Sequence, residues 1–139
     1  MLPVSAKVAM IVMDLLLMPA IELKRISQQT KLGLAYQLVH LQLTTPGGII
    51  EPNDLKGLEL PDGMVWSQGV VIEGKGPIWL YGYLVHECHP AAWVACFDPR
   101  LGEATPQSGG AVVVSTHSRA VEVGEVLLID LPDALFRKS

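Results

Sequence analysis

Hydrophobic residues along the chain form short runs whose spacing predicts two strands with a helix between them. Val70–Ile72 is a β-branched run typical of a buried strand. Ile78–Val85 is apolar on nearly every side, which indicates a buried helix. Pro77 suits the first position of that helix because proline lacks the N–H that would be unpaired there, and Pro90 disfavours helix in the residue before it. Trp93–Phe97 then predicts a second strand.

This order of elements predicts a βαβ unit with two parallel, neighbouring strands. Ligands of such units bind beyond the carboxyl ends of the strands, where Gly74-Lys75-Gly76 and Asp98-Pro99-Arg100 fall. Free N–H groups at the helix N-terminus, with Lys75 beside them, suit a phosphate group. Turn composition by itself favours the simpler interpretation that both segments are ordinary loops.

The rest of the chain predicts further strands joined by turns. Ile21–Ile26 and Leu34–Thr44 suggest a β-hairpin or meander. The second of these alternates apolar and polar residues with a period near two, so it should be half buried, with His40 at the surface. The remaining elements are expected to be turns at Thr45–Gly48 and Leu60–Gly63, a short helix at Glu51–Gly57, an exposed loop at Glu103–Gly110, and strands at Ala111–Ser118 and Val121–Asp130.

Length and composition indicate one α/β domain built on a mixed sheet that contains the βαβ unit. The chain has 139 residues, 50% hydrophobic and 17% charged, which suits a globular domain with its own core. A net charge of −4 argues against binding to long nucleic acids, which favour a basic face, but leaves room for a small anionic ligand. The scarcity of charge also suits self-association. Cys88 and Cys96 lack CxxC spacing and are expected to be buried thiols of a cytoplasmic protein.

Residues 1–17 form an apolar leader segment ahead of the folded domain, which is assigned to residues 18–139. Its unbroken apolar part is too short to span a membrane, and Asp14 interrupts it. It has one lysine and no clean secretory cleavage site. We expect either an appended helix or a segment upstream of a true start at Met18, and in both cases a cytoplasmic protein without membrane contact.

Four residues with metal-binding or acid–base side chains, and one arginine, lie around the predicted βαβ unit. His86 and His89 are three apart and share a helix face, while Asp98 and His117 each end a strand. Imidazole and carboxylate together suit manganese or zinc, which could polarise a phosphodiester, and Arg100 could hold a phosphate bidentately. The simpler alternative is that the histidines cap a helix end and that the aspartate starts a turn and pairs with its arginine neighbour. Spacing alone does not decide between them.

The motifs taken together resemble the third ring-nuclease family of type III CRISPR systems. They are Gly69-Val-Val-Ile72, Gly74-Lys-Gly-Pro-Ile-Trp-Leu80, His86-x-x-His89-Pro90, Phe97-Asp-Pro-Arg-Leu-Gly102 and Ala111-Val-Val-Val-x-x-His117-Ser118. The similarity is strong over residues 69–118 and weaker over 18–130. Each motif is modest by itself, but their order and spacing are specific.

The resemblance implies a manganese-dependent phosphodiesterase that cuts cyclic tetra-adenylate, the second messenger that activates antiviral effectors. It implies a fold related to the CRISPR-associated Rossmann folds, and dimers that sandwich the ring so that opposite faces complete the site. His89, Asp98 and His117 match the family's catalytic and metal-associated positions, with His86 as a weaker candidate. Arg100 matches the arginine assigned to the phosphate.

We therefore expect Gly74, Lys75 and Gly76 of the glycine-rich turn to bind the substrate together with Arg100. Two departures from the family pattern bear on this expectation. Glu73-Gly74-Lys75 stands where the family often has Ser-Gly-Arg, which puts an acid and a point charge at the expected anion site. The loop at Glu103–Gly110 looks longer than usual and could alter packing between dimers. A non-catalytic sensor of cyclic oligoadenylate and a manganese-dependent exonuclease acting on RNA 3′ ends stay open as alternatives.

Overall fold

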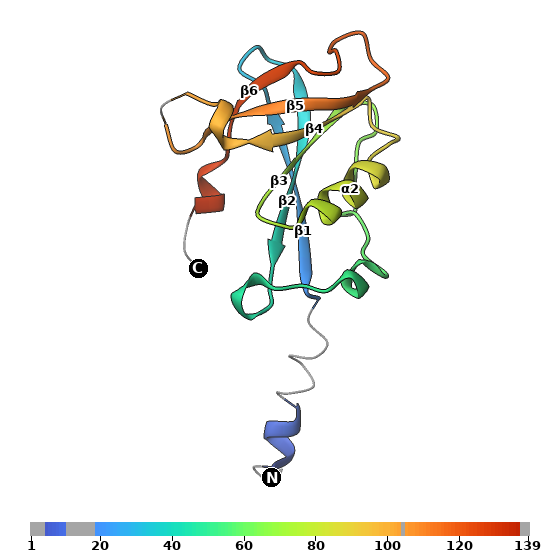
Figure 1. Cartoon of the computed structure of the whole chain (residues 1–139), viewed down its shortest axis with the longest axis vertical. Helices are drawn as coiled ribbons and strands as arrows, with labels where there is room; N and C mark the ends of the chain where they lie inside the picture. Colours follow the sequence, from blue (N-terminus) through green and yellow to red (C-terminus); the bar gives the residue numbers. More distant parts are fainter. Residues whose placement is uncertain (1–4, 11–18, 104, 137–139) are drawn as a thin grey trace.

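The computed structural model describes residues 5–10, 19–103 and 105–136 of the chain. Within this part a single six-stranded sheet follows the sequence order β1-β2-β3-β4-β5-β6 (Figure 1). The strands are β1 (Ile21–Gln29), β2 (Ala35–Leu43), β3 (Gly69–Glu73), β4 (Trp93–Asp98), β5 (Ser108–Thr116) and β6 (Val126–Asp130). Apart from the helical residues 5–10, the helices are α2 (Ile78–Glu87) and the short 3-10 turns η1 (Pro46–Gly48), η2 (Pro52–Leu55), η3 (Pro99–Leu101) and η4 (Asp133–Phe136).

The sheet is mixed, with a parallel centre and antiparallel flanks. β2, β3 and β4 are parallel to one another, while β1 runs antiparallel to β2, β5 to β4 and β6 to β5. β3, α2 and β4 make the expected βαβ unit, and β1 with β2 makes the expected hairpin. The predicted α/β class is therefore confirmed. The carboxyl ends of β2, β3 and β4 meet at one edge of the sheet.

Two hydrophobic clusters fill the two faces of the sheet. One face packs against α2, with Leu80 and Leu84 fully buried against β2, β3 and β4. The other face is covered by the sheet itself, because β5 and β6 cross the direction of β1 and β2 (Figure 1). Trp93 and Ile129 are buried there. The Lys31 N–H donates to the Leu128 carbonyl at 3.3 Å, so the tip of the first hairpin reaches β6.

The burial of α2 and β2 differs from the sequence-based expectation. α2 lies on the surface of the sheet and buries only one stripe, and Ile78 at its start is 88% exposed. β2 is about half buried as expected, but its buried residues do not alternate: Tyr36–Val39 are consecutive and buried on both faces, and Gln42 is exposed. Gln37 is fully buried within it, and its side chain exchanges two hydrogen bonds of 2.7 Å with the Val65 backbone. A polar residue thus stays satisfied in the core.

The loop expected at Glu103–Gly110 is shorter than predicted. Its last three residues, Ser108–Gly110, belong to β5 and are buried. A Cβ at Gly109 would lie 2.1 Å from the Phe97 ring, so only glycine allows this close approach to β4. The final strand begins later than expected, at Val126. Cys88 and Cys96 form no disulfide, and burial raises the pKa of the Cys88 thiol to about 12.

Only part of the predicted leader segment lies within the described residues. Residues 5–10 are helical, and the remainder of 1–17, together with Met18, lies outside the described part of the chain. Among the described helices, none has both the length and the apolar character needed to cross a bilayer.

Candidate functional site

A cavity of about 780 Å³ lies at the edge where the parallel strands end. Its walls come from the end of β2, the turn after β3, the first residues of α2 and the segment that contains η1. The residues that line it are His40, Leu41, Gln42, Leu43, Gly47, Gly48, Ile49, Ile50, Glu73, Gly74, Lys75, Gly76, Pro77 and Trp79. The turn expected to bind the substrate, Gly74-Lys75-Gly76, therefore borders a cavity large enough for a nucleotide.

Close packing against β2 fixes this glycine-rich turn. Gly74 has a φ of +129°, and a Cβ there would lie 2.3 Å from the Leu41 carbonyl oxygen. The Tyr81 hydroxyl of α2 donates to the Gly74 carbonyl at 2.6 Å, which ties the turn to the helix. No side chain caps the start of α2, and Lys75 makes no ion pair within the described residues. These groups remain available to an anion.

His40 and Glu73 form a hydrogen-bonded pair in the wall of this cavity that the sequence did not indicate. The imidazole Nδ1 lies 2.5 Å from Glu73 Oε1, and the two side chains are only 17% and 13% exposed. The expectation that His40 is a surface residue was wrong. The pair forms because the parallel register of β2 and β3 puts these two residues directly opposite each other. That register depends on the tertiary structure, since 32 residues separate the two positions in sequence.

Asp98 and Arg100 form a second pair at the same edge of the sheet. The Asp98 carboxylate accepts bonds from the Arg100 backbone N–H at 2.9 Å, from Nε at 3.0 Å and from Nη2 at 2.8 Å. The guanidinium beside Asp98, followed by the backbone N–H, lowers the pKa of that carboxyl to about 2. The arginine side chain is 85% exposed, and its Nη1 group takes no part in these bonds. The remaining guanidinium N–H groups are therefore exposed at this edge of the sheet.

His89 and His117 come together at the opposite edge of the sheet. Their ring centroids are 5.0 Å apart in an edge-to-face arrangement. The His117 Nε2 lies 3.2 Å from the His89 carbonyl oxygen, and the His117 backbone N–H donates to the Ala92 carbonyl at 2.8 Å. Both imidazoles are exposed. His86 is also exposed, in the last turn of α2.

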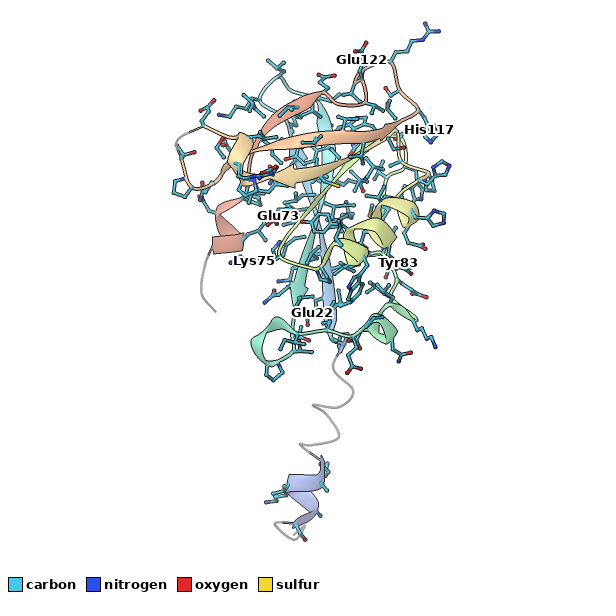
Figure 2. All side chains as sticks on the ribbon, in the orientation of Figure 1. Glu22, Glu73, Lys75, Tyr83, His117 and Glu122 are labelled. Carbon is cyan, nitrogen blue, oxygen red and sulfur yellow. The ribbon has the colours of Figure 1, made fainter. Side chains whose placement is uncertain are left out.

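The residues assigned to catalysis and metal binding therefore divide into two groups within one chain. Thr116, next to His117, pairs with Trp93 at the start of β4, and Asp98 ends that strand. At about 3.3 Å per residue, the two ends of β4 are about 17 Å apart. Figure 2 shows His117 well away from Glu73 and Lys75.

This separation bears directly on the expected manganese site. A single chain offers two imidazoles at one edge and a carboxylate, already bonded to arginine, at the other. Within the described residues no three His, Cys, Asp or Glu side chains gather closely enough to hold a metal ion. His89, Asp98 and His117 thus do not fit a common metal ion within one chain.

The fold and site define an α/β protein with a glycine-turn cavity at the carboxyl edge of its parallel strands. Residues 43–128, more than half of the chain, match the family described as CRISPR-associated protein (Cas_csx3). The chain belongs to this CRISPR-associated family. It is also 46% identical over 79 residues to a protein of Aquifex aeolicus (strain VF5) described as "Uncharacterized protein". That similarity covers 55% of this chain and 65% of the relative, so the chain spans just under two thirds of the relative's length.

Proposed function

We propose that this protein is a ring nuclease that cleaves the phosphodiester bonds of cyclic tetra-adenylate and so switches off type III CRISPR antiviral signalling. The observation that carries the proposal is membership of the CRISPR-associated family over residues 43–128. Every residue assigned to the site, from Gly74 to His117, lies within that span.

The cavity supports a nucleotide ligand. Its walls combine apolar side chains such as Ile49 and Trp79 with the uncapped start of α2 and the ammonium group of Lys75. Apolar walls with a few polar groups are typical of small-molecule sites, and the polar groups here suit an anion. A base would pack against the apolar wall while a phosphate lies at the glycine-rich turn.

The separation of the two residue groups supports a site shared between copies of the chain. Asp98 and Arg100 lie at one edge of the sheet, and His89 and His117 lie at the other. Copies stacked edge to edge would bring the imidazoles of one chain toward the carboxylate–arginine pair of the next. A ring of four nucleotides held between them would then meet both groups, in keeping with heterologous association of subunits.

The side chains suggest a division of roles in cleavage. Arg100 would bind the non-bridging phosphate oxygens through its remaining N–H groups, with its orientation fixed by Asp98. His89 and His117 would exchange protons with the attacking and leaving oxygens, for which imidazole is the usual side chain near neutral pH. The attacking oxygen is water or a ribose 2′-hydroxyl. Manganese enters the proposal as an activator to be tested by addition, and no step depends on it.

Purified protein incubated with cyclic tetra-adenylate, with and without manganese, tests the proposal. We expect linear fragments that increase with manganese. His89→Ala and His117→Ala should each abolish cleavage while leaving thermal unfolding unchanged, because both imidazoles are exposed. Retention of the intact ring without cleavage would instead assign a sensor, and shortening of linear oligoadenylate alone would assign a 3′-exonuclease.

Mixing two inactive variants tests whether the site is shared. His89→Ala and Asp98→Asn should each be inactive alone and should regain activity when mixed. In roughly a quarter of randomly assembled interfaces, one chain would supply the wild-type His89 and its neighbour the wild-type Asp98. A mixture of His89→Ala with His117→Ala is the matched control. These two residues lie side by side in one chain, so no interface in this mixture contains both intact imidazoles from the same chain. Equal inactivity of both mixtures would refute the shared site.

A further inference from the structure

The hydrogen-bonded pair of His40 and Glu73 lies in the wall of the cavity where the anionic ligand is expected. Glu73 and Lys75 flank Gly74, so a carboxylate precedes this glycine and an ammonium group follows it within the glycine-rich turn. A phosphate bound at the turn would meet both charges. The carboxylate opposes its binding unless another group compensates the negative charge.

The charged groups around His40 come from three places. Glu73 lies opposite it on β3, Lys24 lies opposite it on β1, and Lys75 shares the cavity wall. Two residue pairs further along β1 and β2, Glu22 lies opposite Gln42. The other walls, from η1 to Ile50 and from Pro77 to Trp79, carry no charged residue.

The hydrogen bond to Glu73 determines which imidazole nitrogen can serve a ligand. With the carboxylate ionised, Nδ1 must carry a proton and donate it to Oε1. In the neutral ring Nε2 then has only a lone pair, which repels a phosphate oxygen. Once Nε2 takes a proton from solvent, the imidazolium donates from both nitrogens and its charge cancels that of the carboxylate.

We propose that His40, Glu73 and Lys75 form one anion-binding unit in which a phosphate group binds together with a proton on His40. The proton comes from solvent, and no covalent bond forms or breaks. The inference rests on the proposed function only for the identity of the natural ligand, a nucleotide phosphodiester. His40 is a ligand-binding residue of this cavity, and Glu73 is its positioning residue.

Sulfate is the probe, because it stays dianionic from about pH 5 to pH 8 and is no substrate of a nuclease. The titration of His40 is followed by NMR, with and without saturating sulfate. Binding and protonation are reciprocal, so sulfate should raise the titration midpoint of His40 by about one pH unit. Its affinity should correspondingly be about tenfold higher at pH 5.5 than at pH 8, by the same reciprocity. An unchanged midpoint together with a pH-independent affinity would overturn the proposal.

Variants separate the roles of the three residues. His40→Gln keeps a hydrogen-bond donor toward Glu73 but should abolish the pH dependence of sulfate binding. Glu73→Gln should bind sulfate more tightly than wild type at pH 8, because the opposing charge is gone. Lys75→Ala should weaken binding by a similar factor at every pH. His86→Gln, which changes an exposed histidine outside the cavity, is the control and should keep the wild-type pH dependence.

Two results distinguish this inference from the proposed function. If sulfate shifts the His40 midpoint but cyclic tetra-adenylate is neither bound nor cleaved, the anion-binding unit stands and the nuclease assignment fails. If the ring is cleaved but sulfate and the ring both leave the His40 midpoint unchanged, the nuclease assignment stands and this inference fails. The wild-type titration decides the question even where His40→Gln does not fold.

Discussion

Replacing Gly74 with alanine should destabilise the protein and distort the candidate site, for two separable reasons. The residue has a φ of +129°, where an L side chain costs about 1–3 kcal/mol. Its new Cβ would also lie 2.3 Å from the Leu41 carbonyl oxygen, which belongs to the backbone of a buried strand and cannot rotate away. Such overpacking adds about 1–3 kcal/mol. Together the two effects should lower the free energy of unfolding by roughly 4 kcal/mol.

Gly57 provides the matched control. Its φ is +77°, but nothing lies within 4 Å of the position a Cβ would take. Gly57→Ala should therefore show only the backbone cost, about 1–2 kcal/mol. The contrast between the two variants isolates the contact with Leu41.

Urea unfolding measures both variants. With a slope of about 2 kcal/mol per molar urea, Gly74→Ala should lower the midpoint by about 2 M and Gly57→Ala by less than about 1 M. The displaced turn should also weaken the Tyr81 hydrogen bond to the residue 74 carbonyl and change sulfate binding in the cavity. Equal destabilisation by the two substitutions would refute the argument that packing against β2 fixes the turn.

Three further predictions concern the core and the carboxylate–arginine pair. Tyr36→Phe should leave the free energy of unfolding unchanged or raise it by about 1 kcal/mol, because the buried hydroxyl has no hydrogen-bond partner in the described structure. Urea unfolding measures this, and a decrease of more than about 1 kcal/mol would contradict the prediction. Leu84→Ala should lower the free energy of unfolding by about 3 kcal/mol, whereas Ile78→Ala on the exposed side of α2 should lower it by under about 0.5 kcal/mol. Similar losses for the two variants would contradict the assignment of Leu84 to the buried face of the helix. The Asp98 carboxyl should titrate near pH 2 by NMR, so its stabilising contribution is present above about pH 4 and lost only as the pH falls through about 2. Arg100→Ala should return that titration toward the ordinary range, and an unchanged midpoint would show that the guanidinium is not its cause.

The physical basis of the candidate site explains which parts of it were predictable. The glycine-rich turn and the Asp98–Arg100 turn were placed correctly at one edge, because parallel strands in a βαβ unit must end on the same side. The His89–His117 contact could not be derived from spacing, because 28 positions separate the two residues and the antiparallel return of β5 brings them together. The same return places Asp98 far from both imidazoles. The roles of these residues in catalysis, metal binding and substrate binding stay predictions.

The sequence by itself determined the local elements of this protein and the order in which they follow. Proline and glycine positions mark where α2 and the turns begin and end, and β-branched runs mark β3 and β5, because these preferences depend on neighbouring residues alone. Only the tertiary structure decided how deeply each element is buried and which side chains meet. Gln37 is buried where it bonds to the distant Val65 backbone, the register of β2 against β3 joins His40 to Glu73, and the crossing of β5 and β6 covers the face of the sheet opposite α2. Pairing between distant strands is set by the packing of the whole sheet, which no local pattern records.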